Sequence, residues 1–221
     1  MDYKALGSRY LGEAASYLES KKIRRALIVC VIIGVGAGGF YINRYVQQQR
    51  QQNAIAAFNE AMQTYVTALV SEMDANGKDV KSSWDEVELA FQLAYEQNRS
   101  AAFAPYFLIY SAQALAAQNK YIEAAKMVGD ALNQLAKDSP FYDLYSIMQA
   151  NLLIDGGDQA GFEQLKRLAN ESKNYQDAAK YYLAQYYLAH NQVDLAQELF
   201  EQLAMGQSSW SQAAKSYVQT A

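Results

Sequence analysis

The chain has 221 residues and a net charge of −4, which is divided unevenly along its length. Residues 1–50 carry eight Lys/Arg and three Asp/Glu (+5), whereas residues 51–221 carry eleven and twenty (−9). The acidic part is long enough for one domain with a hydrophobic core, and its charge argues against nucleic acid as a partner. The single cysteine, Cys30, lies in residues 1–50, so residues 51–221 cannot form a disulfide among themselves.

Residues 1–25 form the first predicted segment. Tyr3, Leu6, Tyr10 and Tyr17 recur at helical steps opposite charged side chains, which predicts a short amphipathic helix. Gly7 and Gly12 weaken that pattern, so a disordered segment remains the alternative.

Residues 26–46 are predicted to form a single transmembrane helix. Ala26–Ile42 contains no charged residue, Tyr41 and Tyr45 suit the membrane interface, and Gly34 and Gly38 form a GxxxG pair typical of helix dimers. A buried core helix and a cleaved signal peptide are the alternatives. Six basic residues precede the segment and two follow closely, which places the N-terminus in the cytoplasm and the remaining chain outside, in a bacterium the periplasm.

Residues 47–101 are predicted to form a helical stalk and the first helix pair. The first helix is expected to run to about Met73 with an apolar stripe, and the second from Trp84 to Glu96, with Ser83 and Glu86 as a capping box. The expected core residues of the two helices are Ile55, Phe58, Met62, Tyr65, Val66 and Leu69, and Trp84, Val87, Leu89, Phe91, Leu93 and Ala94.

Residues 102–221 repeat themselves, which predicts an α-solenoid of stacked helix pairs with a capping helix at Gln207–Ala221. The repeats start at residues 108, 146, 180 and 210, and a small residue follows each start by four positions: Ala112, Ala150, Ala184 and Ala214. Polar turns are expected at Asn119-Lys120, Gly156-Gly157-Asp158 and Asn191-Gln192. The second pair departs from the pattern at Phe162 and Lys166, which predicts irregular packing there. An ordinary helical bundle is the alternative.

The repeated pattern resembles the tetratricopeptide repeat (TPR), best at Leu183, Ala184, Tyr187, Ala196 and Phe200. The whole arrangement, including ALIVCVIIGVGAGGFYINRYVQQQ, AIAAFNEAMQTY and ALAAQNKYIEAAKMVGDALNQL, resembles the YfgM-like family of ancillary SecYEG translocon subunits. This resemblance implies an all-α, single-pass protein of the bacterial inner membrane with periplasmic TPR-like repeats. It also implies association with export-channel subunits, periplasmic chaperones or emerging chains.

No catalytic set, cofactor motif or metal cluster is recognisable in the sequence, so neither an enzyme, a cofactor nor a small-molecule substrate is expected. His190, the only histidine, is assigned a structural role in a repeat turn. The first helices of the pairs are expected to line a protein-binding groove with Tyr106, Ile109, Gln113, Ile147, Asn151, Tyr181, Gln185 and Lys215. A scaffold for another cell-envelope complex, and an enzyme with an acidic site, are the competing functions.

Overall fold

The computed structural model describes residues 21–74 and 80–218, with the side chains of 40–72 and 83–218. All regular structure in these ranges is helical, and no strand occurs there. The chain divides into two compact units, residues 1–50 and 51–221. The helices are α2 (Lys21–Asp74), α3 (Val80–Asn98), α4 (Ala104–Ala117), α5 (Tyr121–Leu132), α6 (Tyr142–Asp155), α7 (Gln159–Glu171), α8 (Gln176–Ala189), α9 (Val193–Ala204) and α10 (Ser209–Val218).

The predicted membrane segment belongs to α2, whose backbone is helical throughout residues 26–46. Ala26, Gly34 and Gly38 lie outside the residues whose side chains are described, whereas Tyr41 and Tyr45 are exposed. The segment 1–25 lies largely outside the described residues as well. Among the residues that could be searched, no helix is apolar over a length sufficient to cross a membrane.

Small residues hold the second half of α2 against α3. Ala54, Ala61 and Ala68 follow one another at intervals of seven and are at most 3% exposed. A seven-residue interval returns to the same helix face after about two turns, so these alanines allow close approach along one line. Phe58 and Tyr65 pack beside them against Phe91, with ring centroids 5.8 and 6.5 Å away.

The core predicted for these two helices is therefore partly wrong. Ile55, Val66, Leu69, Leu89 and Leu93 were expected inside but are between 38% and 57% exposed. The alanine line faces the buried cluster in place of the large aliphatic side chains, and Phe58 and Tyr65 pack against that cluster beside it. The predicted capping box is also wrong, because α3 already begins at Val80 and Ser83 lies within it rather than before it.

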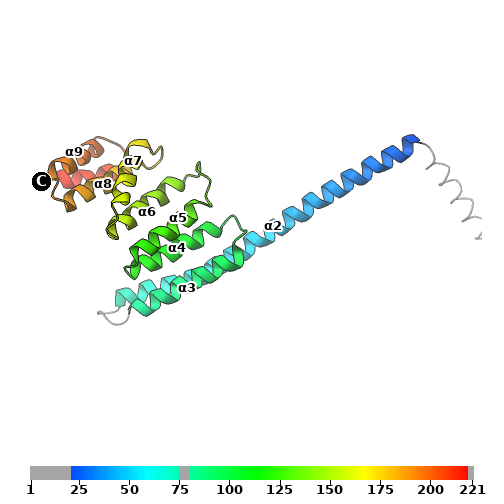
Figure 1. The fold of residues 1–221 in the computed structure, drawn as a ribbon, viewed down its shortest axis with the longest axis horizontal. Helices are drawn as coiled ribbons and strands as arrows, with labels where there is room; N and C mark the ends of the chain where they lie inside the picture. The colour runs from blue at the N-terminus through cyan, green and yellow to red at the C-terminus, as the bar shows by residue number, and fades with distance from the viewer. Residues whose placement is uncertain (1–20, 75–79, 219–221) are drawn as a thin grey trace, which may run out of the picture. The chain divides into compact units, whose positions relative to one another are not determined.

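From α3 to α10 each helix packs against the next one along the chain, the arrangement of an α-solenoid (Figure 1). The core consists of four clusters of buried side chains that follow one another along the chain, and each cluster contains residues of consecutive helices. As predicted, the four repeated alanines are central to this packing and are fully buried: Ala112, Ala150, Ala184 and Ala214. Helices α4, α6, α8 and α10 begin 38, 34 and 33 residues apart, so the last interval is longer than the expected 30.

The three turns within the pairs share one backbone conformation. Asn119, Gly157 and Asn191 occupy equivalent positions, and their φ angles of 62°, 79° and 59° are left-handed. Asparagine and glycine adopt this conformation most readily. In each turn the next N–H donates to a carbonyl five residues earlier, at 2.9 Å for Lys120 and 2.8 Å for Asp158 and Gln192. This is the helix-ending Schellman pattern, and it confirms the predicted turns.

The second pair differs from the others by a one-residue register shift of α7. Phe162 is equivalent to Ala124 of α5 and Ala196 of α9, which are buried at the helix crossings. In α7 the crossing is made instead by Gly161, where an added Cβ would lie 2.4 Å from the carbonyl oxygen of Ala150. One residue corresponds to a rotation of about 100°. The predicted irregularity is thus a rotation that moves Phe162 from the crossing to the side of the pair.

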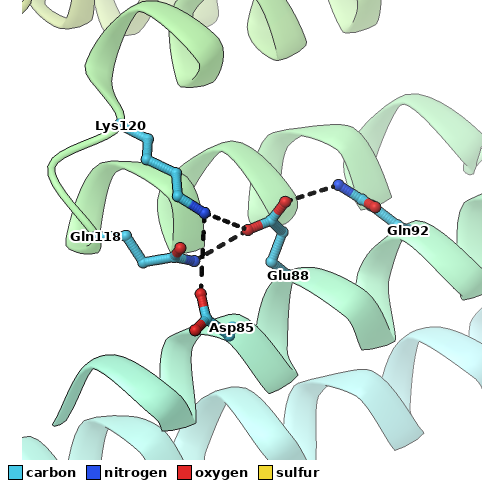
Figure 2. Close-up of polar contacts among 5 residues, drawn as sticks. All are labelled: Asp85, Glu88, Gln92, Gln118 and Lys120. Carbon is cyan, nitrogen blue, oxygen red and sulfur yellow. Dashed lines mark hydrogen bonds and ion pairs between the residues drawn. The ribbon is translucent and has the colours of Figure 1, made fainter.

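A polar junction joins α3 to the turn between α4 and α5. Figure 2 shows Glu88 accepting hydrogen bonds from Gln92 and from Gln118, each at 3.0 Å. The ammonium of Lys120 lies 3.6 Å from Glu88 and 3.9 Å from Asp85. Because Gln118 is only 6% exposed, Glu88 supplies an acceptor that water cannot easily replace.

Candidate protein-binding site

The structure brings two of the predicted groove residues together, at the C-terminal halves of α6 and α8. Asn151 and Gln185 occupy equivalent repeat positions and both line a groove of about 380 Å³ between these first helices of consecutive pairs. The groove is lined by Asn151, Ile154, Asp155, Tyr182, Gln185, Tyr186, Ala189 and His190.

The other predicted residues have different environments. Ile109 and Ile147 are 1% and 2% exposed, so assigning them to a surface was wrong. They occupy the same repeat position as Tyr181, which is half-buried against Phe200 and Trp210. An aliphatic side chain fits completely between helices at this position, whereas tyrosine keeps its hydroxyl near the surface.

Of the remaining three, Gln113 is half-buried and accepts a hydrogen bond from the Tyr65 hydroxyl at 3.0 Å. Tyr106 is half-buried among aromatic rings, and Lys215 is exposed in the last turn of α10. None of these three lines the groove between α6 and α8.

Tyr186 and His190 line one wall of the groove, and Phe162 of α7 stacks on Tyr186 from outside it. Phe162 stacks on Tyr186 with centroids 4.7 Å apart, and Tyr186 stacks on His190 at 3.9 Å. The His190 Nδ1 lies 2.8 Å from the carbonyl oxygen of Tyr186, which fixes the imidazole against the helix. The register shift of α7 is what brings Phe162 to this position. The wall is therefore rigid, with both faces of the Tyr186 ring covered.

Amide groups supply hydrogen-bonding capacity on the same surface. The Gln185 Nε2 donates to the hydroxyls of Tyr181 and Tyr217, at 3.2 and 3.4 Å, which leaves its carbonyl oxygen as an acceptor. Asn151 lies opposite on α6. An amide can donate and accept simultaneously, as the backbone of an extended peptide requires.

One carboxyl group contributes most of the groove's charge. Asp155 is the last residue of α6, and desolvation raises the pKa of its side chain. Among the described residues, no basic side chain forms an ion pair with it. The one carboxyl group of the groove therefore has no lysine or arginine partner among the described residues.

A second aromatic cluster lies nearer the N-terminal ends of α4 and α6. The Tyr106 and Tyr145 rings are 6.2 Å apart, and Phe141 stacks on Tyr145 at 6.3 Å. Burial, followed by the neighbouring phenols of Tyr106 and Tyr110, raises the pKa of Tyr145 to about 12. The Tyr145 hydroxyl thus stays protonated well above neutral pH and can serve as a donor.

Sequence reasoning missed Asp155, Tyr182, Tyr186 and His190 as groove residues. Tyr182 is three positions before Gln185, one helical turn away, and that spacing was the available signal. Tyr186 and His190 follow Tyr182 at four-residue steps on the same face, whereas the stacking of Phe162 on Tyr186 depends on the rotation of α7.

No group of three or more histidine, cysteine or acidic side chains arranged to hold a metal ion occurs within the residues that could be searched. A comparison of the sequence with protein-family models and with curated proteins finds no match.

Proposed function

We propose that this chain is a membrane-tethered, TPR-like protein that binds other proteins through the groove between α6 and α8. The observation that carries the proposal is the groove itself, where an amide side chain from each of two consecutive first helices meets an aromatic wall from α8. Aromatic side chains offer a large contact area at small entropic cost, and the amides suit a peptide backbone. A stacked array of helix pairs commonly uses such a surface for protein recognition.

The proposed tether is the apolar segment at residues 26–46. Its uncharged core and the excess of basic residues before it support a helix spanning the bacterial inner membrane, with the N-terminus in the cytoplasm and the C-terminal domain in the periplasm. The resemblance to the YfgM-like family supports export-channel subunits, periplasmic chaperones or emerging chains as the partners.

Site-specific photo-crosslinking in intact membranes tests this function. A photoreactive amino acid at Asn151, in the groove, should give adducts with export-channel subunits or periplasmic chaperones. The matched control is the same amino acid at Glu198, an exposed position on α9 that does not line the groove. Adducts with cell-wall proteins would assign the chain to another envelope complex, and equal labelling at both positions would refute the groove as the binding site.

A further inference from the structure

The groove between α6 and α8 lies at the carboxyl ends of both helices. α6 ends at Asp155 and α8 at Ala189, and both residues line the groove. The carbonyl end of a helix carries a partial negative charge that favours a nearby cation. Neither helix has a basic residue in its last turn, in contrast to α10, which has Lys215 there. The carboxyl ends of two helices thus line one groove without a lysine or arginine in either last turn, and His190, the C-cap of α8, has its Nδ1 2.8 Å from the Tyr186 carbonyl oxygen.

The Asp155 carboxylate adds a full negative charge to these partial ones. A carboxylate at a helix carboxyl end is electrostatically unfavourable unless a positive charge compensates it. Among the described residues, no lysine or arginine forms an ion pair with Asp155. The domain as a whole is also acidic, with twenty Asp/Glu and eleven Lys/Arg in residues 51–221. A positively charged ligand would complete the site.

The remaining walls favour a flat cation. Tyr182 is 36% exposed, so part of its ring is accessible to a ligand. Tyr186 is fixed between Phe162 and His190, and the side-chain oxygens of Asn151 and Gln185 are acceptors. A guanidinium is planar, stacks on aromatic rings and presents five N–H donors, whereas an ammonium is compact and strongly hydrated.

We propose that this groove binds an arginine side chain of the partner protein. Asp155 is the counter-ion, Tyr182 the stacking surface, and Asn151 and Gln185 provide further acceptors. The inference rests on the proposed function and names the chemistry that the groove selects.

The test uses N-acetyl-arginine amide as the probe, with N-acetyl-citrulline amide and N-acetyl-lysine amide as comparison ligands. Citrulline has nearly the same shape as arginine but carries no charge. The full chain, in micelles of an uncharged detergent at pH 8, is labelled at the isoleucine and alanine methyl groups, so that Ile154 and Ala189 report on the groove. We expect the arginine ligand to shift both signals with a dissociation constant in the millimolar range. Lysine should bind at least threefold more weakly, and citrulline should cause no shift.

Two variants locate the binding. Asp155→Asn should weaken arginine binding at least fivefold, whereas Asp138→Asn, the same change at an exposed position between α5 and α6, should leave it unchanged. Tyr182→Leu should reduce the preference for arginine over lysine. Equal shifts with citrulline, or unchanged binding by a folded Asp155→Asn variant, would overturn the inference. If that variant does not fold, the comparison of arginine with citrulline on the unaltered chain decides.

The two proposals fail separately. Crosslinks from Asn151 without arginine-dependent shifts would preserve the proposed function and eliminate arginine recognition. Arginine-dependent shifts without protein crosslinks would preserve the guanidinium site and eliminate the proposed export partners.

Discussion

Gly161 is the position where a single methyl group should disturb the fold most clearly. In a Gly161→Ala variant the new Cβ would lie 2.4 Å from the Ala150 oxygen and 2.8 Å from both the Ile154 nitrogen and the Leu153 Cβ. Two of these are backbone atoms of α6, so relief requires moving one helix relative to the other. Overpacking of this kind costs about 1–3 kcal/mol, and we place backbone contact at the upper end. The higher helix propensity of alanine offsets about 1 kcal/mol. The expected net loss of stability is therefore about 2 kcal/mol.

Gly129→Ala is the matched control, because Gly129 also lies inside a helix. Its added Cβ would meet only the end of the Gln149 side chain, with Nε2 at 2.7 Å. That side chain can rotate away at the cost of its 3.2 Å hydrogen bond to the Ala125 carbonyl and of the 3.1 Å bond that it accepts from Gln164. The Gln164 amide keeps its other acceptor, the Ser146 carbonyl, so one bond is the main loss. Such a bond contributes about 0.5–1.5 kcal/mol, which the gain in helix propensity roughly cancels. We expect Gly129→Ala to change stability by less than about 1 kcal/mol.

Urea unfolding of the full chain in an uncharged detergent, followed by circular dichroism at the helical band, measures both effects. The urea midpoint of Gly161→Ala should fall well below those of the wild type and Gly129→Ala. A Gly161→Ala midpoint equal to that of the control would refute the close helix crossing and the register shift of α7 inferred from it.

Two further predictions concern stability. Glu88→Ala should cost about 1–3 kcal/mol in urea unfolding because it removes the acceptor of the buried Gln118 amide, whereas Asp85→Ala, which loses only an exposed contact at 3.9 Å, should cost less than about 1 kcal/mol. Equal costs would contradict this difference in burial. Tyr145 should make folding sensitive to high pH: its folded pKa of about 12 exceeds the ordinary 10, so its contribution is complete below pH 10 and is lost as the pH rises toward 12. Urea unfolding at pH 9 and 11 should show a loss of stability that is smaller in Tyr145→Phe than in the wild type, by less than about 1 kcal/mol after allowing for solvent screening at a half-buried site; an identical loss would refute the shifted pKa.

The repeats could be predicted because their signals are local. Asn119 and Asn191 mark turns through a backbone preference of the residue itself, and Ala112, Ala150 and Ala184 mark contacts that recur at the same place in each pair. These features need no knowledge of the neighbouring helices.

The faces of α2 and α3 could not be assigned in the same way. Both helices carry more apolar residues than one contact needs, and the large side chains of Ile55, Leu89 and Leu93 outweighed the smaller alanines in the sequence pattern. The structure buries the face of α2 that carries Ala54, Ala61 and Ala68. Which face is buried depends on both helices together, so it cannot be predicted from the periodicity of one helix alone.

The candidate groove was likewise only partly predictable. Asn151 and Gln185 followed from helical spacing along the first helices, but the stacking of Phe162 on Tyr186 depends on the close crossing at Gly161, which turns Phe162 aside. The sequence showed that Phe162 stands where the other pairs have alanine. Only the position of Gly161 against α6 shows that α7 is rotated to accommodate it.

The unequal spacing of the pairs shows where this architecture tolerates extra length. Within each of the three repeat pairs, α4–α5, α6–α7 and α8–α9, three residues separate the two helices, whereas the connections after these pairs run to nine residues after α5 and four after both α7 and α9. The turns within the pairs have the same length and the same backbone conformation. The difference in repeat length therefore lies in the connections between the pairs. A reporter peptide grafted at residues 136–138 should accordingly leave the stack intact, while the same graft beside Asn119 should separate α4 from α5.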